Sequence, residues 1–258
     1  MTTGTVDRTA LENKVKDMYS DVARNPHGEF HFEMGRAMAE RLGYAAADLD
    51  RVPSEAIDSF AGVGHFFHLA ALEPGEHVVD LGSGSGMDSF IAALKVQPTG
   101  RVVGIDMTDA QLEKARRLAR DQGVANVSFR QAYIEDTGLD SGSVDCVLSN
   151  GVINLAPDKT RVFHEAARLL RAGGRLAIAD IVTDQALPEN VVCNADLWAA
   201  CIGGAAQRDV YRTAIEAAGL TIERVEENRG YQFISDRARK ATAKWGVASV
   251  SILARKRG

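Results

Sequence analysis

The sequence predicts an α/β protein built on a doubly wound, mostly parallel sheet of seven strands. Three observations predict this fold. Short β-branched runs alternate with segments of helical periodicity between residues 75 and 183, a glycine-rich turn follows the first run, and an aspartate ends the second. Strands that alternate with helices form βαβ units, which place parallel strands between two layers of helices.

The strands are the easiest elements to locate. Each is a short apolar run rich in valine, isoleucine or leucine and bounded by glycine or charged residues. Two late runs are expected to add an antiparallel pair that completes the sheet. The predicted strands are residues 77–81, 101–105, 127–131, 144–149, 175–180, 221–226 and 247–254.

The helices between the strands have recognisable ends. Thr108 and Gln111 have the spacing of a capping box, in which both side chains bond free backbone N–H groups. Gly123 is placed to end the helix that follows them. Residues 162–170 form another apolar stripe of helical spacing, which stops before a pair of glycines.

The chain divides into three parts by character. Residues 1–72 are polar and helix-forming, and we expect them to be a helical cover that carries part of a substrate site. Residues 73–183 are the α/β core expected to bind a cofactor. Residues 184–258 supply helices and the final strand pair.

Composition excludes several classes of protein. The sequence has 30 Lys and Arg against 35 Asp and Glu, a formal net charge of −5 that argues against a nucleic-acid-binding surface. The longest uncharged stretch, Ser59 to Leu72, is 14 residues, whereas a membrane span needs about 20. Met1–Lys14 lacks a signal-peptide pattern. We therefore expect a cytoplasmic protein with a small-molecule partner, and the oligomeric state stays open.

The glycine-rich turn at residues 80–86, DLGSGSG, is the sharpest local feature. Glycine adopts positive φ and lets a ligand approach the backbone closely. In a doubly wound sheet this turn lies in the crevice where ligands bind. Asp106 follows Gly86 by 20 residues, the spacing at which an acid reaches the ribose hydroxyls of an adenosine cofactor.

The spacing within the turn favours one adenosine cofactor over another. Dinucleotide sites use G-x-G-x-x-G, which seats a pyrophosphate on the helix N-terminus. Here the pattern is G-x-G-x-G with Asp80 in front. A carboxylate at that position repels pyrophosphate but can pair with a cationic amino group.

With its leading acid, DLGSGSG resembles the first motif of the class I S-adenosylmethionine (SAM) methyltransferases, and LRAGGRL at 170–176 resembles the turn before their fifth strand. The resemblance implies their Rossmann-like fold, SAM as cofactor and an enzymatic methyl transfer. It places Asp80 near the methionine end and Asp106 at the ribose, whereas Asp88 either contacts the cofactor or stabilises the start of its helix. The cofactor-binding residues so implied are Tyr19, Asp80, Gly82, Ser83, Gly84, Asp88, Asp106, Met107, Gln111, Ile134, Glu135, Asn150, Gly151 and Val152.

Three phrases are also similar to the small arsenite methyltransferases: GIDMT at 104–108, SNGVINLAPDK at 149–159 and CIGGA at 201–205. Those enzymes hold As(III) through several cysteine thiolates, the soft ligands that the metalloid requires. This chain departs there, because Gly151 and Ser89 stand where the family has cysteines. Cys201 remains, and Cys193 lies eight residues before it, about two helical turns.

The other cysteine, Cys146, falls within a predicted strand and is expected to be a small buried side chain. None of the three cysteines has CxxC spacing, so neither a disulfide framework nor a metal site is predicted. The residues before the glycine turn are instead rich in histidine and phenylalanine.

We interpret this composition as a cover for an aromatic or apolar organic acceptor, with a histidine as general base. His65 is the first candidate, followed by His68 and His31. The alternative for His65 and His68 is that they lie on the more exposed face of a packed helix and have no catalytic role.

The function predicted from the sequence is SAM-dependent methylation of a small organic molecule. One alternative is arsenite methylation through Cys201 and Cys193. Another is SAM binding without methyl transfer, because cofactor motifs encode binding rather than turnover.

Overall fold

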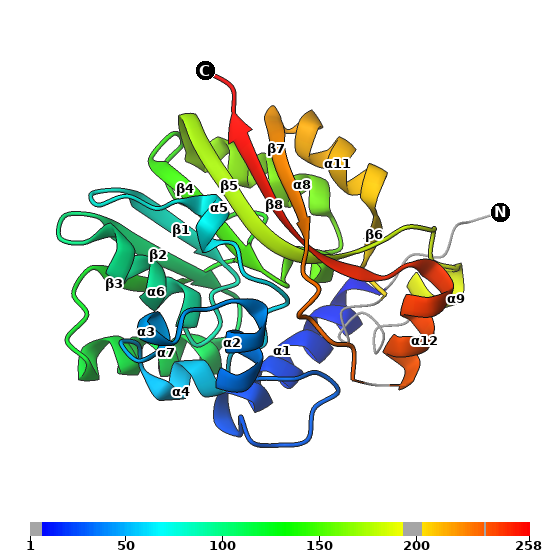
Figure 1. Cartoon of the computed structure of the whole chain (residues 1–258). Helices are drawn as coiled ribbons and strands as arrows, with labels where there is room; N and C mark the ends of the chain where they lie inside the picture. The colour runs from blue at the N-terminus through cyan, green and yellow to red at the C-terminus, as the bar shows by residue number, and fades with distance from the viewer. Residues whose placement is uncertain (1–6, 193–202, 235) are drawn as a thin grey trace.

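A central sheet separates two layers of helices in the computed structural model, which describes residues 7–192, 203–234 and 236–258 (Figure 1). The strand order is β3-β2-β1-β4-β5-β8-β7, and a two-residue strand, β6, pairs with β5 off this path. The first five strands are parallel, whereas β8 is antiparallel to both of its neighbours. The predicted doubly wound, mostly parallel sheet is confirmed.

Six of the seven predicted strands lie close to their predicted ranges. The fifth is longer than the predicted 175–180 and includes the expected turn at 170–176, because Leu170 already pairs with Val144 before a shift in the register. The two-residue strand β6 was not predicted. β1 and β4 form the centre of the sheet, and their nearly continuous burial reflects helices on both faces. The bounds of the strands are β1 His77–Leu81, β2 Arg101–Asp106, β3 Val127–Gln131, β4 Val144–Asn150, β5 Leu170–Thr183, β6 Ala206–Gln207, β7 Leu220–Glu227 and β8 Ala248–Lys256.

Five helices precede the sheet: α1 Arg8–Arg24, α2 Arg36–Leu42, α3 Ala46–Leu49, α4 Ser54–Asp58 and α5 Phe67–Ala70. The later ones are α6 Met87–Val96, α7 Asp109–Asp121, the 3₁₀ turn η1 Ile153–Leu155, α8 Lys159–Leu169, α9 Glu189–Val192, α11 Arg208–Ala217 and α12 Asp236–Trp245. In the described ranges, none of these helices has the length and apolarity that crossing a membrane requires.

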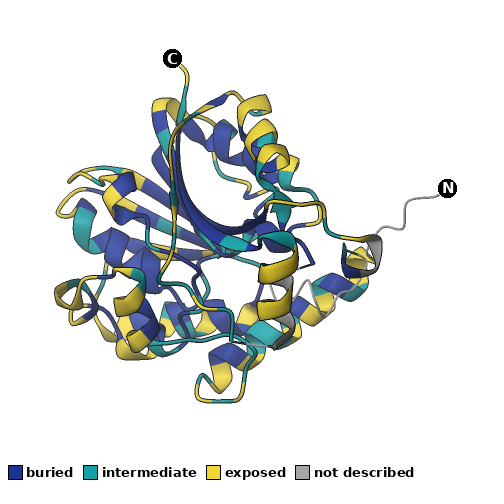
Figure 2. Cartoon of the chain, turned by 45° about the vertical axis from the view of Figure 1, so that its right-hand side comes forward, coloured by how far each residue is buried: buried dark blue, intermediate teal, exposed yellow. Residues whose placement is uncertain are grey.

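The two faces of the sheet carry separate apolar cores. Helices α6 and α7 pack on one face, where Val78 and Leu148 point, and α8 and α11 pack on the other, where Val79 and Val147 point. Figure 2 shows the buried strands between helices whose outer sides are exposed. Because the strand order reverses between β1 and β4, a crevice opens where these two strands end.

The predicted capping box at the start of α7 is wrong. Thr108 is the N-cap residue, but its side chain makes no capping hydrogen bond. Instead, Gln111 donates from Nε2 to the Tyr19 carbonyl at 2.9 Å and accepts from Ser85 Oγ at 2.5 Å. These contacts fix Gln111 toward α1 and the glycine turn, so it cannot reach back to the helix end.

A buried carboxylate joins β5 to two neighbouring elements. Asp180 accepts hydrogen bonds from Tyr211 Oη of α11 at 2.6 Å, from the Asn154 backbone N–H at 2.9 Å and from the Ile181 N–H at 2.8 Å. Burial raises the pKa of Asp180 to about 6, and these donors oppose the shift. Above that pH the carboxyl group is ionised, and these hydrogen bonds stabilise its buried charge.

Replacing Tyr211 with phenylalanine should lower the free energy of unfolding by about 1–3 kcal/mol at pH 8, because it removes a donor to a buried charge. The folded pKa of Asp180 lies above its unfolded value, so the penalty should shrink as the pH falls below 6 and the carboxyl group protonates. Urea unfolding at pH 8 and pH 5 measures both effects. Val210→Ala, at a 58% exposed neighbour, is the control, and equal stability of Tyr211→Phe and wild type at pH 8 would contradict the assignment.

Candidate functional site

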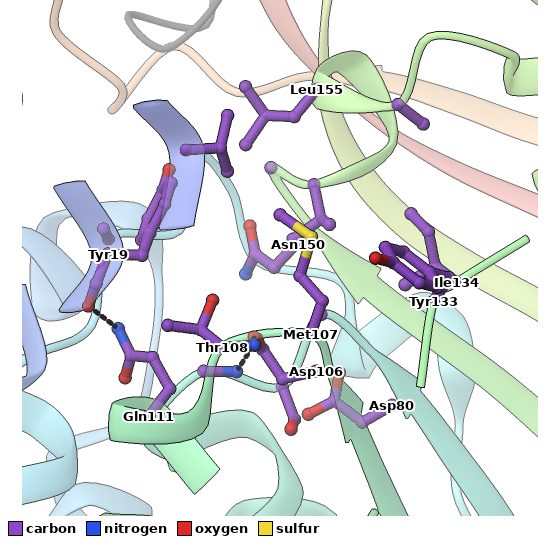
Figure 3. Close-up of a pocket in the computed structure, with 18 of the residues that line it drawn as sticks. Tyr19, Asp80, Asp106, Met107, Thr108, Gln111, Tyr133, Ile134, Asn150 and Leu155 are labelled. Carbon is purple, nitrogen blue, oxygen red and sulfur yellow. Dashed lines mark hydrogen bonds between the residues drawn. The ribbon is translucent and has the colours of Figure 1, made fainter. Parts of the chain in front are cut away.

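A cavity of about 420 Å³ opens where β1, β2 and β4 end. In Figure 3, Asp80 and Asp106 lie on one side of this cavity, Leu155 lies on the other, and Tyr19 and Ile134 flank it. Its walls come from the turns after these strands, from α1, from residues 59–62 and from η1. It occupies the crevice expected at the strand-order reversal.

The turn after β1 folds back onto the end of β2. The backbone N–H groups of Gly82 and Ser83 both donate to the Ile105 carbonyl, at 2.7 and 2.9 Å. Gly82 has φ +74°, and a Cβ at this position would overlap the side chain of Val152. Only glycine fits both the backbone conformation and the space. The bare backbone of this turn is left facing the cavity.

Asp106 is held by backbone donors on two sides. Its Oδ2 accepts from the Gly84 N–H at 2.9 Å and its Oδ1 from the Thr108 N–H at 2.8 Å. Burial raises the pKa of Asp106, and the backbone hydrogen bonds oppose the shift. Carboxylate oxygens accept more than one hydrogen bond, so Asp106 can also accept from ligand hydroxyls.

Apolar side chains lie beyond Asp106. Met107 extends toward Asn150 in Figure 3, and Ile134 stands near it. Glu135 also lines the cavity, and burial raises the pKa of its carboxyl group. This part of the cavity can hold a flat ring between apolar side chains.

Asp80 and Asp88 are two buried carboxyl groups in the same cavity. Ser89 Oγ donates to Asp80 at 2.6 Å, while Tyr44 Oη and Asn150 Nδ2 donate to Asp88 at 2.6 and 3.0 Å. Burial, followed by the charge of Asp88, raises the pKa of Asp80 to about 8, and burial raises that of Asp88 to about 6. These hydrogen-bond donors are all uncharged, so the pair is complementary to a cationic ligand.

Four buried apolar side chains also line the cavity. They are Leu11 and Val15 from α1, Phe60, and Leu155 of η1, all less than 9% exposed, and α1 adds the charged residues Arg8 and Glu12 to the lining. Gly151, with φ +70°, lines the same cavity and carries no side chain. The four apolar side chains can hold an apolar group next to the predicted cofactor site.

All of the residues predicted to bind the cofactor line this one cavity. The sequence did not identify Tyr44, which contributes the shortest hydrogen bond to Asp88, or the apolar residues of α1 and η1. No local sequence motif marks Tyr44, because its partner Asp88 is 44 residues away in the chain. The paired hydrophobic positions of α1 could have been found from its helical periodicity.

The three histidines predicted as general bases do not line the cavity. His65 stacks on His68 with 5.3 Å between ring centroids, and His68 Nε2 lies 2.7 Å from Glu226 Oε2 of β7. His31 packs edge-on against Phe32. Burial lowers the pKa of His65 to about 4. The geometry therefore agrees better with a packing role for His65 and His68 than with a base.

The cysteines are in different situations. Cys146 is fully buried in β4, and burial raises the pKa of its thiol to about 12. Ser89, where the resemblance implies a cysteine, is fully buried and donates to Asp80. Cys193 and Cys201 lie outside the described residues.

More than half of the chain matches a known protein family. Residues 72–219 match the family described as methyltransferase domain. The chain belongs to this family. Residues 7–136 of the methyltransferase also match the description protein-L-isoaspartate(D-aspartate) O-methyltransferase. The predicted membership of the SAM-dependent class I methyltransferases is confirmed, with SAM as the cofactor.

Relatives of the methyltransferase include several arsenite methyltransferases. It is 41% identical to the one from Halobacterium salinarum, over 77% of this chain and 51% of that protein. It is 42% identical to the arsenite methyltransferase from Aquipseudomonas alcaligenes, over 62% of this chain and 48% of that protein. The methyltransferase thus spans about half the length of these relatives.

A solved structure adds to this comparison. An arsenic(III) S-adenosylmethionine methyltransferase from Chlamydomonas reinhardtii is 33% identical, with a TM-score of 0.67 over 88% of this chain and 75% of that chain. The predicted closeness to arsenite methyltransferases is therefore confirmed.

The cavity suits SAM by two observations. The buried carboxyl groups of Asp80 and Asp88 have only uncharged hydrogen-bond donors among the described residues, which suits the cationic amino group of the methionine end. Asp106 is fixed by the backbone with oxygens that can accept from the ribose hydroxyls.

Replacing Asp106 with alanine should weaken S-adenosylhomocysteine binding roughly 100-fold, because two hydroxyl hydrogen bonds to a charged acceptor are lost. Calorimetry measures the affinity, and circular dichroism checks that the fold is intact. Asp109→Ala removes an exposed carboxylate at the start of α7 and should leave the affinity unchanged. Wild-type affinity in a folded Asp106→Ala variant would refute this assignment of the ribose site.

Proposed function

We propose that this methyltransferase transfers the methyl group of SAM to a small organic acceptor with an apolar or aromatic body. The observation that carries the proposal is the wall formed by Leu11, Val15, Phe60 and Leu155 beside the cofactor site. Gly151, at a position where the arsenite methyltransferases have a thiol, contributes only backbone to the same region. Neither feature suits a soft metalloid, and both leave room for carbon.

The residues would hold SAM as follows. Asp106 accepts from the ribose hydroxyls, Met107 and Ile134 contact the adenine, and the Asp80–Asp88 pair faces the amino group of the methionine end. When bound, SAM supplies a methyl group that its positively charged sulfonium makes electrophilic.

The acceptor would be positioned by apolar contact. Leu155 and the α1 side chains exclude water from the acceptor, which favours methyl transfer because alignment and desolvation govern an in-line displacement. Residues 59–62 and α1 both belong to the predicted N-terminal cover, which would thereby provide the substrate side of the site.

The side chains of this cavity also restrict the nucleophile. Among the described lining residues there is no histidine, lysine or cysteine. We therefore expect an acceptor atom that needs no imidazole beside it, such as an amine, a thiolate or a stabilised carbanion. The predicted base role of His65, His68 and His31 stays a hypothesis, which an alanine variant of each can test.

The acceptor is found by incubating the protein with methyl-deuterated SAM and a panel of aromatic and aliphatic amines, thiols and acidic carbon compounds, with detection by mass spectrometry. Leu155→Ala should then raise KM roughly tenfold, because about 1.5 kcal/mol of apolar contact is lost. Its S-adenosylhomocysteine affinity should not change. Leu139→Ala, a partly buried leucine outside the cavity, is the control, and an unchanged KM in Leu155→Ala would remove the acceptor wall from the proposal.

Arsenite methylation is the second candidate, and the 41% identity to a relative of that name favours it. Cys201 and Cys193 would supply the thiolates. Incubation with As(III), glutathione and SAM tests it. The organic-acceptor proposal predicts no methylated arsenic, whereas a methylated product that disappears in Cys201→Ser would overturn it. SAM binding without product from either class of acceptor would favour the third hypothesis, a SAM-binding protein without methyl transfer.

A further inference from the structure

Asp80 and Asp88 come from different elements but meet in one cavity. Asp80 is the fourth residue of β1, and Asp88 is the second residue of α6. Both line the cavity, with exposed fractions of 2% and 5%. Their hydrogen-bond donors are a serine hydroxyl, a tyrosine hydroxyl and an asparagine amide, none of which carries a charge.

The groups around the pair do not offset its negative charge. Asp106 faces Asp80 from β2 and adds repulsion, and Tyr44 faces Asp88 from the segment after α2. No described residue forms a salt bridge with either carboxylate. Two carboxylates in a site of low dielectric constant do not both ionise easily. Burial raises the pKa of both groups, and the charge of Asp88 adds to the rise at Asp80, so the unliganded pair resists losing both of its protons.

We propose that the Asp80–Asp88 pair is a proton-linked receptor for the ammonium group of the cofactor: the ammonium takes the place of a proton that the pair holds in the free protein, so binding releases about one proton to solvent. The carboxyl O–H bond breaks, the proton leaves to water, and the ammonium keeps its own protons. This inference rests on the proposed SAM site and extends it to Asp88 and to the pH dependence of binding.

Asp88 is also linked through Asn150 to the segment that follows Phe60. The Nδ2 of Asn150 donates to Asp88 and to the Gly64 carbonyl, both at 3.0 Å, while its Oδ1 accepts from the Val63 N–H at 2.8 Å. Hydrogen bonds to an ionised carboxylate are stronger than those to a neutral one. Asp88 has the lower pKa of the pair, so near pH 7 its carboxylate holds Asn150, and through it the segment after Phe60.

Two ligands separate the ammonium from the rest of the cofactor. S-adenosylhomocysteine carries the ammonium, whereas 5′-methylthioadenosine has the same nucleoside and thioether without the amino acid. Titration calorimetry of both from pH 5.5 to 8.5, in two buffers of different ionisation enthalpy, counts the protons released. S-adenosylhomocysteine should release close to one proton near pH 7, and its affinity should rise by up to tenfold per pH unit between about pH 6 and 8. The affinity of 5′-methylthioadenosine should stay flat.

Asp88→Asn is the matched variant, because it keeps the shape of the side chain and removes one charge of the pair. The proton release and the pH dependence for S-adenosylhomocysteine should fall, while 5′-methylthioadenosine binding is retained. Asp109→Asn, which changes an exposed carboxylate, should leave both profiles as in the wild type.

Tight binding of S-adenosylhomocysteine without proton release would overturn this inference and leave the proposed function standing. Binding of neither ligand would overturn the SAM site as well. Proton release that Asp88→Asn does not alter would assign the proton to another group and would also contradict the proposal.

Discussion

The burial of carboxylates at one edge of the sheet is the constraint on which the rest of the site depends. Asp80, Asp88 and Asp106 all line a single cavity, and their donors are uncharged. Burying a carboxylate without a counter-charge is costly, and hydrogen bonds offset only part of that cost. This cost explains why the glycine turn donates an N–H to Asp106. It also explains why hydroxyl groups donate to Asp80 and Asp88. A cationic ligand would supply the positive charge that the described residues around these carboxylates lack.

The same constraint links the N-terminal region to the sheet. Asn150, at the end of β4, joins Asp88 to the backbone of residues 63–64. On the other side of that segment, Ser249 Oγ of β8 donates to the Val63 carbonyl at 2.6 Å. The segment is thus held between the centre of the sheet and its antiparallel end. Phe60, just before this segment, is likewise buried in the core of the protein.

Sequence patterns predicted the fold, and they singled out residues that line one cavity, because strand periodicity and the spacing of glycines and acids are local properties. The direction in which individual side chains point was harder to predict from the sequence. His65 and His68 were expected at the cavity, but His65 packs against Tyr44 and Phe67, and His68 lies against Glu226 of β7. The capping box at Gln111 was wrong for a similar reason, since contacts distant in sequence decided where its amide points. Such contacts leave no trace in a window of neighbouring residues.

The left-handed backbone of Gly151 restricts which side chains this position can carry. Any other residue at φ +70° is strained by about 1 kcal/mol or more, and a Cβ there would lie 3.1 Å from Val63 Cγ1. A cysteine introduced here by a single substitution would therefore hold its sulfur on a strained and crowded backbone, so the position tolerates a thiol ligand poorly.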